Sequence, residues 1–379
     1  MLYDIVKHNA NMWERGDLMK PRFKYIELAE QIKAQIISGC YAPGDKLPTE
    51  SEMISASGMS RQTVRQALAL LVSENVIEKR QGSGSKVLLS SHRATNSNGG
   101  STVAVITTYI NEYIFPDILR LIQETLMENR YMTTIFATKN RADYERKILT
   151  DIMEHSFSGL IVEGTKTAFP NPNTDLYKEI EKRGIPTVFI HSSYQELPSF
   201  ISVTADDRDG GDIATKYLIE NGHEKIAGIF KSDDIQGHRR YAGYVKALRE
   251  KNLQIPDDNV LWYATESSEL VGKAGGSIVK GCSAAVCYND EIAMQLITHL
   301  TAEGVKVPDD VSVISFDNST LSELCVPRIT SCSLQNEKIG ILAADKLVNL
   351  INGIPQNSVV LPWRVEVKDS VKSLAATKT

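Results

Sequence analysis

The stretch that decides the fold of the first part of the chain is "SRQTVRQALALLVSENVIEKRQGSGSKVLL" (Ser60–Leu89). It begins with Ser60, a residue type that caps helix N-termini, and continues with apolar residues at helical spacing. These apolar residues form one face of the predicted helix: Val64, Ala67, Leu68 and Leu71. The runs "VIEKR" and "KVLL" then flank "QGSGS", which predicts a β-hairpin with Gly82 and Gly84 at its tip.

Two further helices are predicted ahead of this stretch. "YIELAEQIKAQIISG" (Tyr25–Gly39) carries apolar side chains at three- and four-residue spacing, and Gly39 ends the helix. Its predicted apolar face consists of Ile26, Ala29, Ile32, Ile36 and Ile37. "LPTESEM" offers Thr49 as an N-cap with Glu52 three residues later, the capping box of a second, short helix. Three helices followed by a hairpin constitute a winged helix-turn-helix fold.

Arg61 and Arg65 lie one turn apart near the start of the third predicted helix. In helix-turn-helix proteins this region meets base edges in the major groove, and the planar arginine fork suits guanine or two phosphate oxygens. A simpler alternative is a solvated helix face, the usual role of such a pair. "GSGSK" resembles a phosphate-binding loop only superficially, because it lacks the P-loop spacing and leads into a strand. The hairpin hypothesis is therefore favoured, with a glycine tip that can approach a phosphate backbone closely.

Charge is distributed unevenly along the 379-residue chain, whose net charge is −5. Residues 20–90 contain 10 Lys and Arg against 7 Asp and Glu, a charge of +3, so the remainder carries −8. A basic head on an acidic body is typical of a DNA-binding module joined to another domain. No apolar run reaches the roughly 18 residues of a transmembrane helix, and the first 20 residues lack an export signal, so we expect a cytoplasmic protein. The five cysteines have no metal-site or disulfide spacing, and we predict no metal and no cofactor.

A polar segment, "SSHRATNSNGGS" (Ser90–Ser101), predicts a flexible linker. Behind it, short apolar runs alternate with amphipathic helical stretches. The expected strands are "TVAVITTYI", "MTTIFAT", "GLIVEG", "PTVFIHS", "FISVTA", "KIAGIF", "AAVCYND" and "VSVISFDN", and the expected helices are Pro116–Asn129, Asp143–Glu154, Gly210–Asn221, Arg240–Lys251 and Glu291–Glu303. Continuous apolar strands alternating with helices indicate parallel sheets covered on both faces. The number of units favours two α/β lobes side by side.

The segment Lys24–Leu89 resembles the GntR family of bacterial winged-helix regulators. The matching motifs are "KY" (Lys24–Tyr25), "PGDKLPTESEM" (Pro43–Met53), "SRQTVRQALALL" (Ser60–Leu71) and "VIEKRQGSGS" (Val76–Ser85). This resemblance implies operator-DNA contacts by Lys24, Glu50, Ser60, Arg61, Thr63, Arg65, Gln81 and Gly82. The chain departs from many members at Ser51, where they carry arginine, so a contact there is lost or replaced.

Most of Thr102–Lys372 resembles the LacI/GalR type of sugar-sensing domain, which has the two-lobed fold of periplasmic sugar-binding proteins. The matching motifs are "DDRDGGDIATKYLIENGHEKIAGI" (Asp206–Ile229), "HRRYAGYVKALRE" (His238–Glu250), "AAVCYNDEIAMQLI" (Ala284–Ile297), "VPDDVSVISFDNS" (Val307–Ser319) and "LPWRVEVKDSV" (Leu361–Val371). A bound polyol requires several charged or amide groups in a cleft at the carboxyl ends of strands.

By position, the resemblance implies ligand contacts by Arg240, Asn289 and Asp317. Further candidates that follow predicted strands are Tyr109, Glu112, His191 and Asp206. Two alternatives stay open. The pair Asn289-Asp290 could cap the next helix, with Asp290 favoured in that role, and His191 could be a structural hydrogen-bonding group.

A GntR-like head on a LacI-like body resembles the arabinose-responsive repressors of Gram-positive bacteria over nearly the whole chain. The resemblance implies a homodimeric transcriptional repressor that binds double-stranded operator DNA and is released by a monosaccharide, L-arabinose. We accordingly predict an α/β architecture in four segments. Residues 1–20 form an unstructured extension, 21–89 the winged-helix DNA-binding domain, 90–101 the linker and 102–379 the two-lobed effector-binding domain.

Three alternative functions stand beside this one. A repressor of the same architecture tuned to a different sugar is not distinguished by residue spacing. A sugar-binding transport component would need an export signal, and would not need Arg61, Arg65 and the hairpin. An enzyme is disfavoured because the sequence has no nucleophile elbow, no H-E-x-x-H and no G-x-G-x-x-G between strand and helix, so no catalytic residue is predicted.

Overall fold

The computed structural model describes residues 24–37, 40–41, 44–73, 76–80, 84–87, 102–255, 257–334 and 336–374. The chain forms two compact units, one of residues 1–99 with 348–356 and one of residues 100–347 with 357–379. The predicted extension (1–20), the predicted linker (90–101) and Gly39 lie outside the described residues. None of the described helices combines the length and the apolar character needed to cross a membrane.

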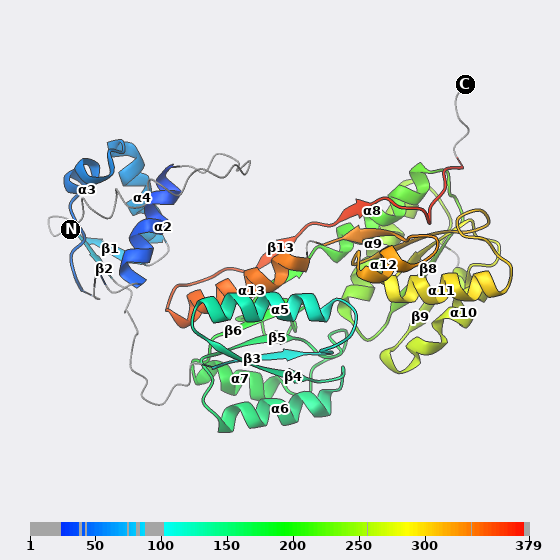
Figure 1. Cartoon of the computed structure of the whole chain (residues 1–379), viewed down its shortest axis with the longest axis horizontal. Helices are drawn as coiled ribbons and strands as arrows, with labels where there is room; N and C mark the ends of the chain where they lie inside the picture. Colours follow the sequence, from blue (N-terminus) through cyan, green and yellow to red (C-terminus); the bar gives the residue numbers. More distant parts are fainter. Residues whose placement is uncertain are drawn as a thin grey trace. The chain divides into compact units, whose positions relative to one another are not determined.

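The first unit contains the predicted winged helix-turn-helix (Figure 1). Its elements are α2 (Lys24–Ile37), α3 (Glu50–Ser57), α4 (Arg61–Ser73), β1 (Ile77–Arg80) and β2 (Gly84–Val87). The two strands pair antiparallel as a hairpin. The predicted inward face of α4 is buried in full: Val64, Ala67, Leu68 and Leu71. In α2 the prediction was wrong at Ile26, which is only half-buried, whereas Leu28 is buried in the core; the side chain of Ile37 is not described.

Local capping fixes where α3 and α4 begin. Thr49 Oγ1 accepts a hydrogen bond from the Glu52 N–H at 3.3 Å, and Glu52 Oε2 accepts one from the Thr49 N–H at 2.7 Å, which confirms the capping box. Gly58 ends α3 at a φ of 66°, in the left-handed region that glycine favours. Ser60 Oγ accepts from the Thr63 N–H at 3.2 Å and caps α4 as predicted. The turn between the two helices therefore follows from local sequence.

The second unit has two α/β lobes, each built around a six-stranded sheet. Lobe 1 has the strand order β13-β7-β6-β5-β3-β4, with all neighbouring strands parallel. Lobe 2 has the order β14-β12-β11-β10-β8-β9, with only the edge strand β14 antiparallel to its neighbour. The strands of lobe 1 are β3 (Thr102–Thr107), β4 (Met132–Ala137), β5 (Gly159–Glu163), β6 (Thr187–His191), β7 (Ile201–Ala205) and β13 (Val359–Leu361). Those of lobe 2 are β8 (Ile226–Lys231), β9 (Val260–Tyr263), β10 (Ala284–Cys287), β11 (Ser312–Phe316), β12 (Thr330–Ser333) and β14 (Arg364–Glu366).

Helices cover the sheets, which explains why most strands are continuous apolar runs. Figure 1 shows α5 and α13 on one side of the lobe 1 sheet and α6 and α7 on the other. The helices of lobe 1 are α5 (Phe115–Glu128), α6 (Ala142–Glu154), α7 (Thr174–Lys182) and residues 336–347 of α13 (Asn336–Ile351). Those of lobe 2 are α8 (Asp207–Glu220), α9 (Ile235–Glu250), η2 (Asp257–Asn259), η3 (Thr265–Leu270), α10 (Val271–Ile278), α11 (Asp290–Ala302) and α12 (Thr320–Leu324). Every strand and helix predicted for this unit is present, and the two-lobed α/β prediction is confirmed.

The chain passes between the lobes three times within the described residues. It crosses from β7 into α8, from β12 into α13, and from β13 into β14. Helix α13 packs on lobe 1, where a Cβ on Gly340 would lie 2.8 Å from the Ile118 carbonyl oxygen of α5. Leu334 and Trp363 stand at the second and third crossings. Both lobes therefore contribute side chains to the space between them.

Helices α8 and α9 of lobe 2 approach closely at two glycines. A Cβ on Gly211 would lie 2.0 Å from the Arg240 carbonyl oxygen, and one on Gly243 would lie 2.0 Å from the Arg208 carbonyl oxygen. This contact brings Arg240 beside Asp207 at the start of α8, where its Nε donates to Asp207 Oδ1 at 3.0 Å. The glycines thus position a buried ion pair.

We predict that Gly243→Ala lowers the free energy of unfolding by about 3 kcal/mol, because its methyl group would overlap the α8 backbone. Without that overlap, alanine would stabilise the helix by about 1 kcal/mol, so the sign of the change is decisive. Chemical denaturation of the full chain measures the effect. Ala242→Ser, at the neighbouring exposed position, is the control and should leave the unfolding midpoint nearly unchanged. A stabilised Gly243→Ala variant would contradict the close helix contact.

Candidate functional site

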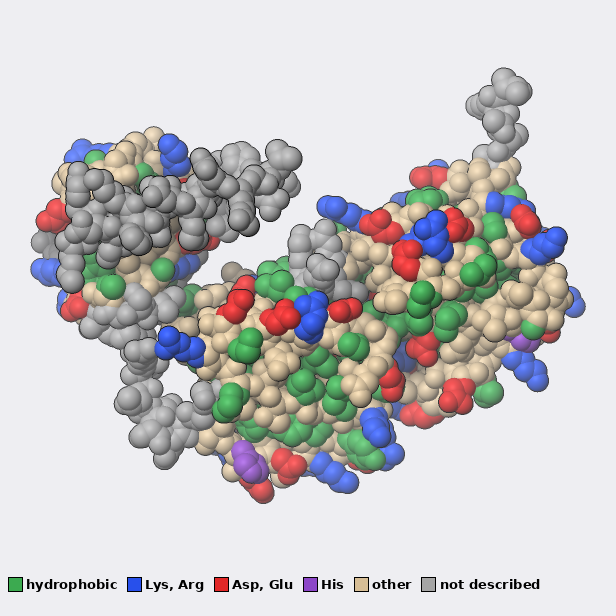
Figure 2. Space-filling view, in the orientation of Figure 1, with side chains coloured by type: hydrophobic (Ala, Val, Ile, Leu, Met, Phe, Trp, Pro, Cys, Tyr) green, Lys and Arg blue, Asp and Glu red, His purple; other side chains and the backbone are tan. Residues whose placement is uncertain are grey.

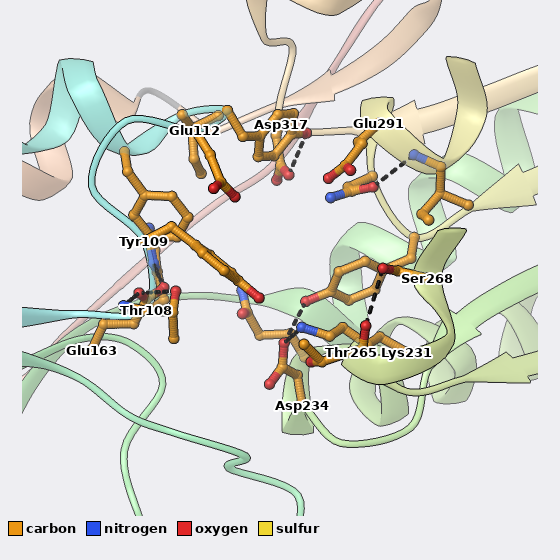
Figure 3. Close-up of a pocket in the computed structure, with 18 of the residues that line it drawn as sticks. Thr108, Tyr109, Glu112, Glu163, Lys231, Asp234, Thr265, Ser268, Glu291 and Asp317 are labelled. Atoms are coloured by element: carbon orange, nitrogen blue, oxygen red, sulfur yellow. Dashed lines mark hydrogen bonds and ion pairs between the residues drawn. The ribbon is translucent and has the colours of Figure 1, made fainter. Parts of the chain in front are cut away.

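A cavity of about 310 Å³ lies between the two lobes, at the carboxyl ends of their strands. Lobe 1 contributes the loop after β3 and the ends of β5 and β6, and lobe 2 contributes the segments after β8, β10 and β11. Six of the seven predicted effector-binding residues line it: Tyr109, Glu112, His191, Arg240, Asn289 and Asp317. Figure 3 shows side chains of both lobes facing this common space, with Thr108 and Tyr109 opposite Ser268 and Glu291.

Asp206 is the exception, because its position does not support the prediction that it contacts a ligand. Its carboxylate accepts a hydrogen bond from the Asp209 N–H at 3.0 Å and caps α8. The side chain that faces inward is the next one, Asp207, which is fully buried and bonded to Arg240. Adjacent helix positions point about 100° apart, and neither of the two carboxylates is among the groups that line the cavity.

Arg240 is fixed on all sides and only 2% exposed. Besides its bond to Asp207, its Nη1 donates to the Tyr288 carbonyl at 2.5 Å, and its Nη2 lies 3.6 Å from Asp317 Oδ1. The guanidinium also stacks on three rings, with centroid distances of 4.4 Å to Phe316, 4.8 Å to Tyr288 and 5.0 Å to Trp363. Burial alone would lower the pKa of Arg240, but the carboxylates of Asp207 and Asp317 raise it above its ordinary value. Arg240 is thus a permanently charged, preoriented group at the cavity wall.

Asn289 both lines the cavity and begins α11. Its Oδ1 accepts from the Ile292 N–H at 3.0 Å, so Asn289 is the N-cap. The expectation that Asp290 caps this helix was wrong. Asp290 is fully buried, and its carboxylate accepts hydrogen bonds from the Ser331 hydroxyl at 2.6 Å and from the Ser319 N–H at 2.6 Å. Burial, and then the charge of Asp317, raise the pKa of Asp290 to about 6.

His191 and Glu163 form a buried pair in the lobe 1 wall. His191 Nδ1 lies 2.9 Å from Glu163 Oε1, while Glu163 Oε2 accepts from the Thr108 N–H at 2.8 Å and the Thr108 hydroxyl at 2.6 Å. Burial would lower the pKa of His191, but the hydrogen bond and charge of Glu163 raise it above its ordinary value. Burial would raise the pKa of Glu163, but the same pairing and the Thr108 donors lower it. Among the described residues His191 Nε2 is buried without a hydrogen-bond partner, so it is available to a ligand.

Sequence reasoning missed several lining residues that share one recognisable signal. Glu163 ends β5, Lys231 ends β8 and Asp234 follows β8, so each lies at the carboxyl end of an apolar run. Lys231 Nζ donates to Asp234 Oδ2 at 2.7 Å, and the Tyr288 hydroxyl donates to the same oxygen at 3.3 Å. Figure 3 shows the Lys231–Asp234 pair on the side of the cavity away from Glu112 and Asp317.

The predicted operator contacts lie on the first unit. The outer face of α4 is exposed and carries Arg61, Gln62, Arg65, Gln66 and Ala69. Glu50 joins this face to the hairpin, because its carboxylate accepts from Arg65 Nε at 3.2 Å and from Lys79 Nζ at 2.7 Å. These bonds, that of Lys79 first, lower the pKa of Glu50. Gln62 and Gln66 were not predicted, although their spacing from the two arginines places them on the same face.

The remaining predicted contacts divide between described and undescribed positions. Lys24 is exposed at the start of α2, and the hydroxyls of Ser60 and Thr63 lie 2.8 Å apart at the start of α4. Gln81 and Gly82 lie outside the described residues. Gly84 opens β2 with a φ of 83°, the positive value expected near the hairpin tip. Within the described ranges, no cluster of His, Cys, Asp and Glu side chains is arranged to hold a metal ion.

Comparisons with known proteins agree with both units. Residues 24–87 match the bacterial regulatory proteins of the gntR family, and residues 215–371 match the periplasmic binding protein-like domain. Among solved structures, the transcriptional regulator CelR–cellobiose complex superposes with a TM-score of 0.65 at 21% identity, covering 93% of this chain and 100% of that chain. Transcription regulator CcpA of Lactococcus lactis gives a TM-score of 0.65 at 25% identity, covering 72% of this chain and 100% of that chain.

Two curated relatives extend over both units. The arabinose metabolism transcriptional repressor of Halalkalibacterium halodurans is 36% identical over 339 residues, which is 86% of this chain and 89% of that protein. The protein of the same name from Geobacillus stearothermophilus is 36% identical over 334 residues, which is 86% of this chain and 91% of that protein. The chain therefore belongs to the family of arabinose metabolism transcriptional repressors, with a gntR-type DNA-binding head and a periplasmic-binding-protein-like body.

Proposed function

We propose that this sugar-responsive repressor is a cytoplasmic homodimer without enzymatic activity, released from its operator when L-arabinose occupies the cavity between the lobes. The observation that carries the proposal is the set of preoriented polar groups around that cavity. Arg240 and Asn289 are each held by neighbouring groups of their own lobe, Asp317 accepts a hydrogen bond from Tyr113, and His191 Nε2 has no partner within the described residues. Such fixed donors and acceptors suit a small polyol.

The charges around the cavity support an uncharged sugar rather than a sugar phosphate. The lysine and the arginine that line the cavity are already ion-paired, Lys231 with Asp234 and Arg240 with Asp207. Three carboxylates line the cavity without an ion pair in the described part of the chain: Glu112, Glu269 and Glu291. A phosphate entering here would meet unpaired negative charge and no unpaired lysine or arginine. The assignment to a pentose comes from the names of the relatives.

For the operator, we propose that α4 enters the major groove and that Arg61 and Arg65 contact bases or phosphates. Glu50 holds Arg65 and Lys79 in place before DNA arrives. On the body, Figure 2 shows acidic and basic side chains interspersed over the visible face, a mixture that gives no strong attraction to DNA. Sugar binding then needs to weaken operator binding by only about 1–3 kcal/mol to serve as a switch.

The first prediction concerns the effector. Isothermal titration of the full chain should show binding of L-arabinose, with much weaker binding of arabinose 5-phosphate because of the cavity carboxylates. At about 100 times Kd, L-arabinose should stabilise the chain by about 2.7 kcal/mol. Tight binding of another sugar and not of L-arabinose would leave the repressor function standing and reject the assignment of L-arabinose as its effector. Preference for the phosphate would contradict the charge argument.

The second prediction concerns the operator. Arg65→Ala should weaken operator binding by about 1–3 kcal/mol, or about 5- to 150-fold, because a bidentate contact is lost. Fluorescence anisotropy with labelled operator DNA measures the change, and sugar affinity should stay as in the wild type. Arg120→Ala is the matched control, since Arg120 is an exposed arginine on α5 in the second unit. Equal operator affinity in Arg65→Ala and Arg120→Ala would argue against α4 as the reading helix.

The third prediction concerns pH and the His191–Glu163 pair. The folded-state pKa of His191 lies above its ordinary 6.5, so its contribution to stability is complete below about pH 6.5 and is lost as pH rises through the folded value. The folded-state pKa of Glu163 lies below its ordinary 4.5. The contribution of Glu163 to stability is therefore complete above about pH 4.5 and is lost as pH falls through the folded value. Urea unfolding without sugar should therefore show a larger difference between wild type and His191→Gln at about pH 5.5 than at about pH 8.5. A difference that grows with pH would mean that the pair is not charged in the folded protein.

A further inference from the structure

Tyr113 reaches from lobe 1 into lobe 2 at the edge of the cavity. It lies in the loop between β3 and α5, the same loop that carries Tyr109 and Glu112, and its φ of 58° is in the left-handed region. Nothing in the sequence marks it, because it follows no strand directly and matches no motif. This backbone conformation is strained and costs stability, and the contacts of the Tyr113 side chain explain why it is kept.

Within the described ranges, the Tyr113 hydroxyl bonds only to groups of lobe 2. It donates to Asp317 Oδ2 at 2.7 Å, lies 3.2 Å from the Phe316 carbonyl oxygen, and accepts from the Asp290 N–H at 3.1 Å. Burial raises the pKa of Tyr113 well above its ordinary value, and the carboxylates of Asp317 and Asp290 raise it further. The hydroxyl therefore keeps its proton and remains a donor to Asp317.

These contacts hold one carboxylate from two sides. Tyr113 of lobe 1 binds Oδ2 of Asp317, while Arg240 of lobe 2 lies 3.6 Å from Oδ1. Asp317 lines the cavity and itself has a positive φ of 93°. If the lobes moved apart, the Arg240 contact would persist, whereas all three Tyr113 contacts would break. The orientation of Asp317 is thus complete only in the closed arrangement.

We propose that Tyr113 is a positioning residue that couples closure of the lobes to effector binding, by fixing the Asp317 carboxylate when the lobes meet. The proposal rests on the proposed function, since it concerns the same cavity. The sugar enters the cavity while the lobes are open, and closure of the lobes then retains it. Tyr113 contributes to retention rather than to entry, so its loss should speed release of the sugar and leave the association rate unchanged.

Other contacts between the lobes give a comparison. Asn140 Nδ2 donates to Thr265 Oγ1 at 2.7 Å, and the Ile235 N–H donates to Thr167 Oγ1 at 3.1 Å. Neither contact involves Asp317. Closure as such therefore does not depend on Tyr113 alone, and removing its hydroxyl should leave the lobes able to close without orienting Asp317.

The test uses Tyr113→Phe in the full chain, which removes one oxygen and keeps the ring. Stopped-flow tryptophan fluorescence with L-arabinose should show a dissociation rate about tenfold faster, an unchanged association rate and so a Kd about tenfold higher. Without sugar, the melting temperature should equal that of wild type. Tyr144→Phe is the matched control, because its hydroxyl, also in lobe 1, makes no hydrogen bond within the described residues.

The possible outcomes separate this proposal from the one on which it rests. If wild type binds L-arabinose and Tyr113→Phe binds it equally tightly with the same dissociation rate, the positioning role is wrong. Suppose that the variant without sugar melts at a lower temperature than wild type, and that its loss of sugar affinity is no larger than this loss of stability explains. Tyr113 is then a structural residue, and the proposal is likewise overturned. A wild-type chain that binds no sugar overturns the proposed function, and the Tyr113 proposal with it.

Discussion

The buried guanidinium of Arg240 is the constraint on which the effector unit depends. A charge that is 2% exposed is tolerated only with carboxylates and hydrogen-bond acceptors around it, and these come from α8, β10 and the end of β11. Removing one partner would leave an uncompensated buried charge. The close glycine contact between α8 and α9 lies at this same point. The packing of the two helices therefore also determines the electrostatics of the cavity wall.

The cavity follows from that arrangement. With Arg240 fixed in lobe 2, and His191 and Glu163 fixed in lobe 1, these groups are rigid before a ligand binds. Preorganisation reduces the entropy lost on binding, which favours a small ligand with few contacts. The remaining freedom lies between the lobes, which are joined by three crossings. A sugar that bridges both walls would therefore act on the relative placement of the lobes rather than on either wall.

The sequence predicted those parts that depend on local patterns. The family resemblance implied Asn289 and Asp317, and both line the cavity just after strands, where parallel strands place their carboxyl ends at one edge. Asp206 was predicted because it follows a strand, but its carboxylate caps α8 and does not line the cavity, which no strand pattern reveals. In α2, Ile26 was predicted to face the core and is half-buried, whereas Leu28, which was not predicted, is buried. Tyr113 had no signal at all, since its partner Asp317 is 204 residues away along the chain.

The central claim is that the sugar cavity and the operator-binding face are linked. The most direct measurement is the affinity of the full chain for L-arabinose with and without saturating operator DNA. Linkage is reciprocal, so the account predicts that operator DNA weakens sugar binding by about 5- to 150-fold. Equal affinities in the two titrations would contradict it, because a sugar whose binding ignores the operator cannot release the repressor from it.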